Sequence, residues 1–213
     1  MKKLMTFVLA AALALPAFSQ SYHPSYALTQ RYDRTNTEHY FGLRLGLNTA
    51  SVGSDDVDLD YGARTGLNLG LVYGIQLTNT APVWLELGVS YSEKGGKIMD
   101  KGRDFKMRQT YLELPVICKY SFAATDECFV APFIGGYLAV GVAGKMKDYT
   151  NRIVYKTFDT FSRFDGGLRL GCGVEYQMIY AELGMEFGVA NISKDEFASA
   201  HNQNFFVNVG VNF

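Results

Sequence analysis

The sequence predicts an all-β protein, an eight-stranded antiparallel up-and-down transmembrane β-barrel. Three observations lead to this fold class. Within several runs, single apolar residues alternate with small or polar ones. The connections between these runs are alternately short and long, and the chain ends on one such run, NFFVNVGVNF. Alternation with a period of two marks a strand with two different faces. An even number of strands with unequal connections is typical of barrels that cross a membrane.

The start of the chain has the layout of a secretory signal peptide. Two lysines precede the apolar run LMTFVLAAALALPAF, and the small residues Ala17 and Ser19 predict cleavage that leaves Gln20 as the first mature residue. The run is shorter than the ~20 apolar residues of a membrane-spanning helix. Residues 1–19 are therefore expected to direct export. Residues 20–38 show no period and are expected to form a periplasmic N-terminal tail, either mobile or docked to a periplasmic partner.

Composition excludes some classes of protein. The chain has 20 Lys and Arg against 21 Asp and Glu, a balance that does not suggest nucleic acid as a partner. Three cysteines are too few for a disulfide framework, and Cys118 and Cys172 lie among apolar residues. The 22 Gly, 15 Phe and 14 Tyr are typical of a barrel with small residues inside its strands and aromatic residues at the membrane interfaces.

Eight strands are expected within residues 39–213, which form the barrel domain. In order they are FGLRLGLN (41–48), GLNLGLVYGIQL (66–77), VWLELGVSY (83–91), YLELPVICKY (111–120), FVAPFIGGYLAVGV (129–142), FDGGLRLGCGVEY (164–176), IYAELGMEFGV (179–189) and NFFVNVGVNF (204–213). The fifth is apolar on both parities, so its two faces stay unassigned. The turns TNTAP, AATDE and QM are short, whereas long polar loops are expected at 49–61, 93–108, 144–163 and 190–203.

The alternation alone would also fit a secreted β-sandwich or a lipocalin-like barrel, with the apolar face toward a core. The other face decides between these folds, because it combines glycines with charges of both signs. Glycine weakens an exposed strand, whereas inside a narrow barrel it relieves crowding and opposite charges can pair. The expected lumen charge network is Arg44, Glu86, Glu113, Lys119, Arg169, Glu175, Glu182 and Glu186, packed beside Trp84, Tyr111, Tyr180 and Phe206. A tight turn at Gln177–Met178 is expected to place Arg169 directly opposite Glu186, whereas a register shifted by a bulge would bring Arg169 to Glu182 or Glu113 instead.

The apolar face should meet lipid between two belts of aromatic rings. Phe41, Tyr120, Tyr176 and Phe213 are expected near the short turns, and Tyr91, Phe164, Phe187 and Phe205 near the long loops. The last strand should pair with the first, because an open sheet edge is not tolerated in lipid. Its terminal aromatic residue resembles the signal that the barrel assembly machinery reads during insertion, which makes that machinery an expected partner.

YLELPVICKY, the Phe/Pro/Gly-rich run after it and FDGGLRLGCGVEY together resemble the PorT-like outer-membrane β-barrel family, often labelled "porin family protein". The resemblance covers about residues 39–213. It implies an eight-stranded barrel in the outer membrane and no shared catalytic site. Some relatives take part in secretion or surface assembly, but the resemblance does not assign that role.

The expected function is that of an integral outer-membrane protein with a side-chain-filled lumen, in a structural or surface-interaction role. Eight strands enclose an interior just wide enough for side chains, so a monomer that is not a general diffusion pore is expected. The alternatives are a small porin or channel, a secretion-accessory barrel and a lipid-modifying enzyme. Ser199, His201 and Glu196 share one outer loop without an orienting scaffold, so no enzyme activity is expected.

No cofactor or metal site is expected. The three histidines have no ligand spacing between them. The acidic stretch SDDVDLDYG departs from a calcium-binding loop, which leaves a solvated loop or weak Ca²⁺ binding as its interpretations.

Two long loops are basic. Residues 94–108 hold six Lys and Arg against two Asp, and residues 145–163 hold five against two. One side of the barrel mouth is therefore expected to carry positive charge beside the outer-membrane lipid and lipopolysaccharide. Either these charges are merely solvated, or they bind lipid A phosphates or an acidic glycan, with Lys97, Lys101, Lys147 and Arg152 as the first candidates.

Overall fold

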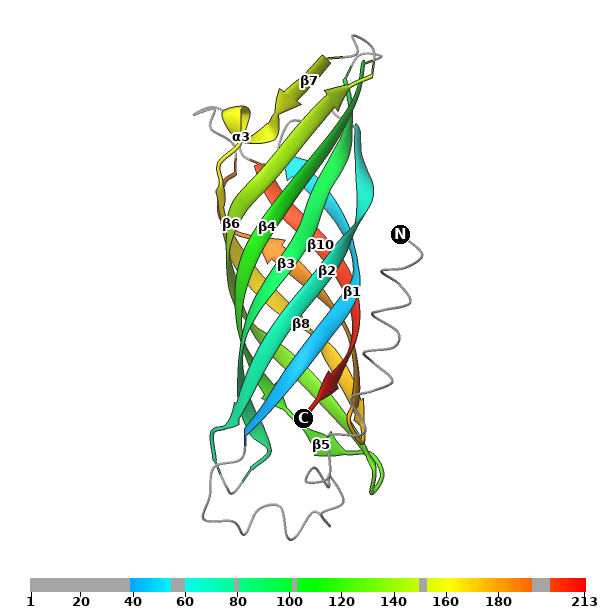
Figure 1. Cartoon of the computed structure of the whole chain (residues 1–213), viewed down its shortest axis with the longest axis vertical. Helices are drawn as coiled ribbons and strands as arrows, with labels where there is room; N and C mark the ends of the chain where they lie inside the picture. Colours follow the sequence, from blue (N-terminus) through cyan, green and yellow to red (C-terminus); the bar gives the residue numbers. More distant parts are fainter. Residues whose placement is uncertain (1–38, 55–59, 79–80, 101–102, 150–152, 193–199) are drawn as a thin grey trace.

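A computed structural model shows a closed barrel of eight long antiparallel strands (Figure 1). The structure describes residues 39–54, 60–78, 81–100, 103–149, 153–192 and 200–213. The long strands are β1 (His39–Ser54), β2 (Asp60–Gln76), β3 (Val83–Asp100), β4 (Arg103–Tyr120), β6 (Cys128–Asp148), β8 (Phe164–Tyr176), β9 (Ile179–Gly188) and β10 (Ala200–Asn212). Two short strands, β5 (Phe122–Ala123) and β7 (Ile153–Lys156), pair with β6, and α3 (Thr157–Thr160) follows β7.

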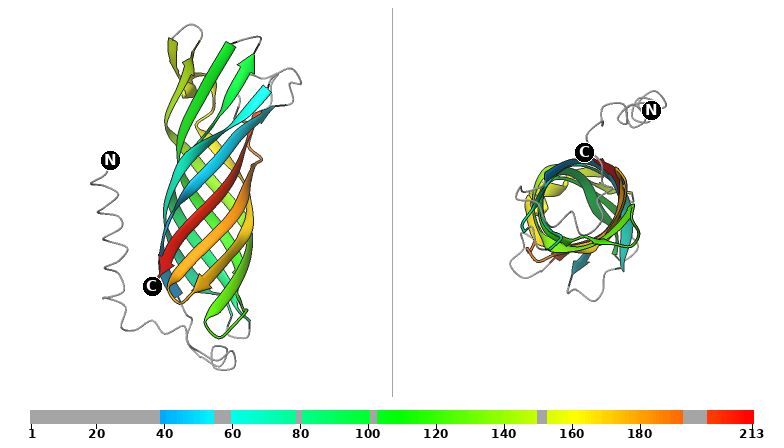
Figure 2. Two further views of the ribbon diagram at one scale, coloured as in Figure 1. Left: turned by 90° about the vertical axis from the view of Figure 1, so that its right-hand side faces the viewer. Right: turned by 90° about the horizontal axis from the view of Figure 1, so that it is seen from below.

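The predicted fold class is confirmed by the sheet topology. Each long strand pairs antiparallel with its neighbours in sequence, and β10 pairs with β1 to close the ring seen end-on in Figure 2. Phe41 and Phe213 exchange two backbone N–H···O hydrogen bonds of 2.8 Å. The C-terminal aromatic residue is thus held in the closing seam. The predicted signal peptide and periplasmic tail, residues 1–38, lie outside the described residues.

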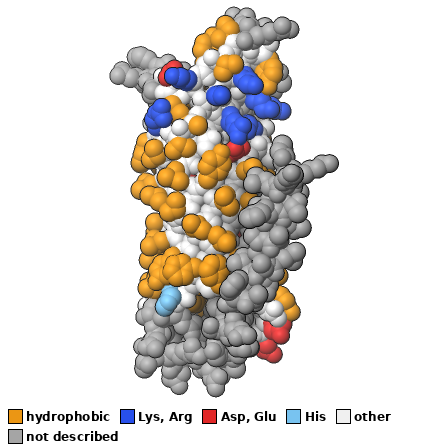
Figure 3. Space-filling view, in the orientation of Figure 1, with side chains coloured by type: hydrophobic (Ala, Val, Ile, Leu, Met, Phe, Trp, Pro, Cys, Tyr) orange, Lys and Arg blue, Asp and Glu red, His pale blue; other side chains and the backbone are white. Residues whose placement is uncertain are grey.

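The apolar parity points outward and the polar parity inward. Leu71 is 62% exposed on the outer face, whereas Arg169 is 5% exposed inside the barrel. Figure 3 shows many of the outward side chains as a broad hydrophobic band on the face of the wall that is turned to the viewer. The aromatic rings expected at the two margins of this band are all exposed. No helix among the described residues is long and apolar enough to cross a membrane.

The faces of β6, which the sequence left unassigned, are separated in the structure. Ile134 and Leu138 point outward and are 61% and 56% exposed, while Phe133 and Tyr137 point inward and are buried. Both parities are apolar because one face of this wall belongs to the hydrophobic outer band and the other packs on aromatic rings inside the barrel. Phe133, for example, stacks on Phe206 with ring centroids 6.5 Å apart.

The predicted long loops were too long. The strands continue well into them: β3 runs to Asp100 and β4 begins at Arg103, while β6 runs to Asp148. Figure 1 shows β3, β4 and β6 rising past the rest of the barrel, with β7 at their tip. The upper parts of these strands leave the apolar band, so their outward positions become charged and the apolar alternation stops although the strand does not.

Candidate functional site

The lumen at the short-turn end is closed by a cluster around Glu86. Its Oε2 atom lies 2.6 Å from Lys119 Nζ and 3.3 Å from Arg44 Nη2, and it accepts a 2.5 Å hydrogen bond from Tyr40 Oη. Lys119 also donates to Tyr180 Oη at 2.9 Å. These side chains are all buried. A single carboxylate on β3 therefore gathers cations and hydroxyls from β1 and β4.

A second cluster fills the lumen nearer the long loops. Arg169 Nη1 lies 2.8 Å from Glu186 Oε1, and its Nη2 lies 3.2 Å from Glu182 Oε1. Lys94 Nζ lies 2.7 Å from Glu113 Oε1 and 2.8 Å from Glu186 Oε2. The predicted pairing of Arg169 with Glu186 is confirmed by the strand register as well as by this contact.

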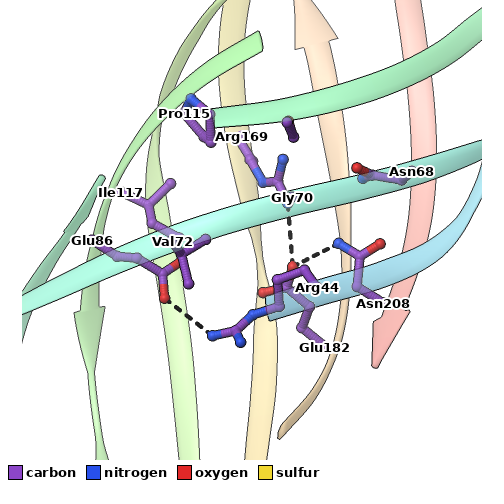
Figure 4. Close-up of a pocket in the computed structure, with 11 residues that line it drawn as sticks. Arg44, Asn68, Gly70, Val72, Glu86, Pro115, Ile117, Arg169, Glu182 and Asn208 are labelled. Carbon is purple, nitrogen blue, oxygen red and sulfur yellow. Dashed lines mark hydrogen bonds and ion pairs between the residues drawn. The ribbon is translucent and has the colours of Figure 1, made fainter. Parts of the chain in front are cut away.

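The two clusters are joined through Glu182. Tyr180 Oη donates to Glu182 Oε2 at 3.1 Å, and Asn208 Nδ2 donates to its Oε1 at 2.8 Å. Figure 4 shows Arg169 and Asn208 directed at this carboxylate, with Arg44 directed at Glu86 beside them. The Arg44 guanidinium also lies 4.0 Å from the centroid of the Tyr180 ring. Charge, hydroxyl and amide groups thus form a continuous network along the barrel axis.

All eight charged residues expected in the lumen face inward. Seven are buried, and Glu175 is half-buried at the short-turn end, where it accepts a 2.8 Å hydrogen bond from Asn212 Nδ2. The sequence interpretation missed Lys94, which it placed in an outer loop. The structure instead buries Lys94 completely between Glu113 and Glu186. The sequence did hold a signal for this position. Lys94 has the same parity as Glu86, and even-numbered residues of β3 continue to face inward.

The cavity that several of these groups line is small. Its volume is about 20 Å³, room for roughly one water molecule, and it lies at mid-lumen. Its lining is Arg44, Asn68, Gly70, Val72, Glu86, Ser90, Pro115, Ile117, Arg169, Glu182 and Asn208. Glycines make the close packing possible, because a Cβ atom at Gly173 would collide with the Tyr180 ring and one at Gly74 with the Tyr40 ring.

An apolar layer covers the charge network at the long-loop end. The segment after β7 turns inward, and Phe158 of α3 packs against Tyr111, Tyr137 and Ala139 inside the barrel. The Tyr111 and Phe158 rings meet edge to face, with centroids 6.0 Å apart. A second apolar cluster consists of Val52, Met107, Ile192 and Ala200, and Phe161 packs against it. No periodic signal in the sequence predicts this inward turn, because the segment is neither an amphipathic strand nor a long helix.

The predicted anion-binding residues are only partly within the described residues. Lys97 and Lys147 are exposed on the outer faces of β3 and β6. Lys101 and Arg152 lie outside the described residues. Lys97 and Lys147 share one neighbour on β4, which is also basic: Lys106 pairs with both of them in the sheet register.

The other chemical motifs do not assemble into a site in the part of the chain that the structure describes. No group of three or more His, Cys, Asp or Glu side chains there could hold a metal ion. The Nδ1 atom of His201 lies 3.2 Å from the carbonyl oxygen of Ala190. Ser199 and Glu196, which the sequence places in the same loop as His201, lie outside the described residues. Asp56 and Asp58 of the acidic stretch lie outside them as well.

Solved structures of small bacterial barrels are similar to the chain. A major outer membrane protein from Thermus thermophilus is 14% identical, with a TM-score of 0.49 and coverage of 83% of this chain and 100% of that chain. OprG of Pseudomonas aeruginosa is 13% identical, with a TM-score of 0.47 and coverage of 84% and 97%. Ail, the attachment invasion locus protein of Yersinia pestis, is 14% identical, with a TM-score of 0.42 and coverage of 83% and 99%.

No curated protein matches the chain. The family model described as "Outer membrane protein beta-barrel domain" matches residues 18–194, most of the sequence. That match agrees with the closed barrel, its apolar outer band and its polar interior. The chain therefore belongs to the outer membrane protein beta-barrel domain family.

Proposed function

We propose that this small outer-membrane barrel acts through its surface, in a structural or interaction role, and does not conduct solutes or catalyse a reaction. The observation that carries the proposal is the filled lumen. Ion pairs block it at two levels, and aromatic side chains cover the upper level. Solute would have to displace Arg169 and Lys94 from their carboxylates to pass.

The proposed orientation of the barrel in the membrane follows from the difference between its two ends. Both chain ends of the barrel and the short turns lie at one end, and the extended strands β3, β4 and β6 project at the other (Figure 1). In outer-membrane barrels the short turns face the periplasm. The projecting end is accordingly the cell-surface end. We also propose that a signal peptide at residues 1–19 directs export of the chain. The barrel assembly machinery then inserts it into the outer membrane.

Within the family, we place the chain with the PorT-like barrels, as a monomer. The support is the strand YLELPVICKY, which supplies Glu113 and Lys119 to the lumen clusters. Pro115 sits inward on this strand, opposite Tyr137 of β6 in the register.

A liposome-swelling assay tests the absence of a diffusion pore. Proteoliposomes holding the refolded barrel are diluted into isotonic arabinose, and swelling is compared with that of empty liposomes and of liposomes holding a general porin. Swelling equal to that of empty liposomes is expected. Swelling at a porin-like rate would show that the lumen opens to sugars, and the small-porin alternative would replace this proposal.

An epitope-insertion experiment tests the orientation. One tag is inserted between Lys101 and Gly102, in the β3–β4 connection, and a matched tag between Thr125 and Asp126, in the β4–β6 turn. Antibody should label intact cells that carry the first tag and only permeabilised cells that carry the second. The reverse labelling would contradict the proposed orientation while leaving the filled lumen untouched.

A further inference from the structure

Six exposed basic side chains lie in two rows on the outer wall of the projecting strands. The sheet register places Lys97 opposite Lys106 and Lys106 opposite Lys147, which forms an upper row across β3, β4 and β6. It places Arg108 opposite Lys145 and Lys145 opposite Lys156, which forms a lower row across β4, β6 and β7. All six are exposed. Figure 3 shows basic side chains gathered above the hydrophobic band.

Like charges face one another at every step of both rows. Directly opposed side chains on adjacent strands have Cβ atoms ~4.5–5.5 Å apart, and like charges at that distance are unfavourable. Among the side chains that the structure describes on the outer faces of β3, β4, β6 and β7, Glu93 is the only acidic one. It is buried between Arg108 and Arg64, so it offsets the lower row at one edge only.

The two rows begin where the apolar band ends. Along β4 the outward residues pass from Leu114 and Leu112 through Thr110 to Arg108, and along β6 from Val142 to Lys145. Three residues of strand cover about 10 Å along the strand axis, and the strands are tilted. The lower row therefore lies at the depth where hydrocarbon gives way to headgroups, and long Lys and Arg side chains can reach further toward either side.

We propose that these basic rows bind the phosphate groups of a phosphorylated glycolipid in the outer leaflet. The inference rests on the proposed orientation, which puts the rows in that leaflet. The occupant is a lipid because the apolar wall continues directly below the rows, so acyl chains packed on Leu112 and Val142 bring their headgroup to the lower row. It is anionic because, among the described outward side chains of these four strands, six cations stand against one carboxylate, which contacts only Arg108 of the rows. Two rows, one above the other, suit a headgroup with more than one phosphate.

The test measures binding of lipid A to the refolded barrel in phosphatidylcholine nanodiscs, where neither cellular orientation nor conductance affects the result. The probes are phosphorylated lipid A, the same lipid A with its phosphates removed, phosphatidylglycerol and inorganic phosphate. Removal of the phosphates should weaken binding at least tenfold. Raising the salt from about 0.05 to 0.5 M should weaken it also, since these charges are exposed and are screened.

The decisive variant is Lys106→Gln, Lys145→Gln and Lys147→Gln in one protein. It removes the centre of both rows and keeps Arg108, the partner of Glu93. The matched control is Thr49→Glu, Ser51→Glu and Gln203→Glu, which makes the same change of three charges at outward positions of β1 and β10 on another part of the wall. The first variant should weaken binding at least tenfold, and the control by less than threefold.

Four outcomes would overturn the inference. They are equal binding of dephosphorylated lipid A, unchanged binding by the lysine variant, an equal loss in the control, and equal binding of phosphatidylglycerol. Inorganic phosphate that bound as tightly as the lipid, with the same dependence on the three lysines, would assign the rows to a free anion instead. Gel mobility before and after heating confirms that each variant is folded before binding is measured.

Discussion

Arg169 and Glu186 face each other across the β8–β9 hairpin, with Nη1 and Oε1 2.8 Å apart. The other oxygen of Glu186 lies 2.8 Å from Lys94 of β3, a strand that does not pair with β9. One carboxylate therefore ties together two walls of the barrel across its interior. The same ion pairs therefore occupy the lumen and connect strands that are not neighbours in the sheet.

Replacement of Arg169 by Met should destabilise the barrel strongly. Glu182 and Glu186 would lose their shared cation while remaining buried, and breaking a buried ion pair from one side costs about 3–5 kcal/mol. Urea unfolding in lipid vesicles, followed by gel mobility, measures the change. The double variant Arg169→Met, Glu182→Gln removes one of the stranded charges and should recover part of the loss. A change below about 1 kcal/mol in the single variant would mean that water reaches these carboxylates.

Gly173→Ala should also be destabilising, for a steric reason. The nearest atoms to a Cβ at Gly173 all belong to the Tyr180 ring, which is 1% exposed and cannot move aside. Overpacking of this kind costs about 1–3 kcal/mol. Gly96→Ala is the matched control, because a Cβ there has its nearest neighbour at 3.4 Å, an ordinary contact. The same unfolding measurement should separate the two variants, and equal stabilities would contradict the close packing of the lumen.

Phe158→Ala should loosen the outer cover while the barrel wall stays folded. The ring is buried against Tyr111 and Tyr137, so its loss removes the apolar contacts that hold α3 inside the barrel. Limited proteolysis should then cut the segment around β7 and α3 faster, by about tenfold or more, with little change in urea unfolding of the wall. Val154→Ala is the control, since Val154 is exposed on β7. Equal cleavage of the two variants would show that Phe158 does not hold the segment.

The strand count, the in/out assignment and the closing seam could be predicted from sequence because each depends on a period of two that lipid on one side imposes. Arg169 opposite Glu186 was predictable for the same reason, since a two-residue turn fixes the register. The period-two alternation of apolar residues stops where the strands extend beyond the apolar band. Lys94 and Arg108 look like loop residues because the residues two places before and after them, on the same faces, are not apolar, although both belong to strands.

Contacts across the lumen could not be predicted either. The position of Lys94 between Glu113 and Glu186 depends on the curvature of the closed sheet, which no local pattern encodes. The inward turn of Phe158 depends on space left by Gly141 and Gly144, glycines that the sequence does not distinguish from others in the barrel. The two rows of like charges depend on the β3–β4, β4–β6 and β6–β7 registers, and one of these contains a shift between Thr110 and Tyr111.

Single-channel recording in planar lipid bilayers tests the filled lumen most directly. The wild-type barrel is compared with the variant Tyr180→Ala, Phe206→Ala, which removes two fully buried rings from the interior and leaves every ion-pair residue in place. The wild type should show no stable, uniform channel, and the emptied variant should conduct more, because its lumen can admit water. Large, uniform wild-type channels that the two substitutions leave unchanged would contradict the account.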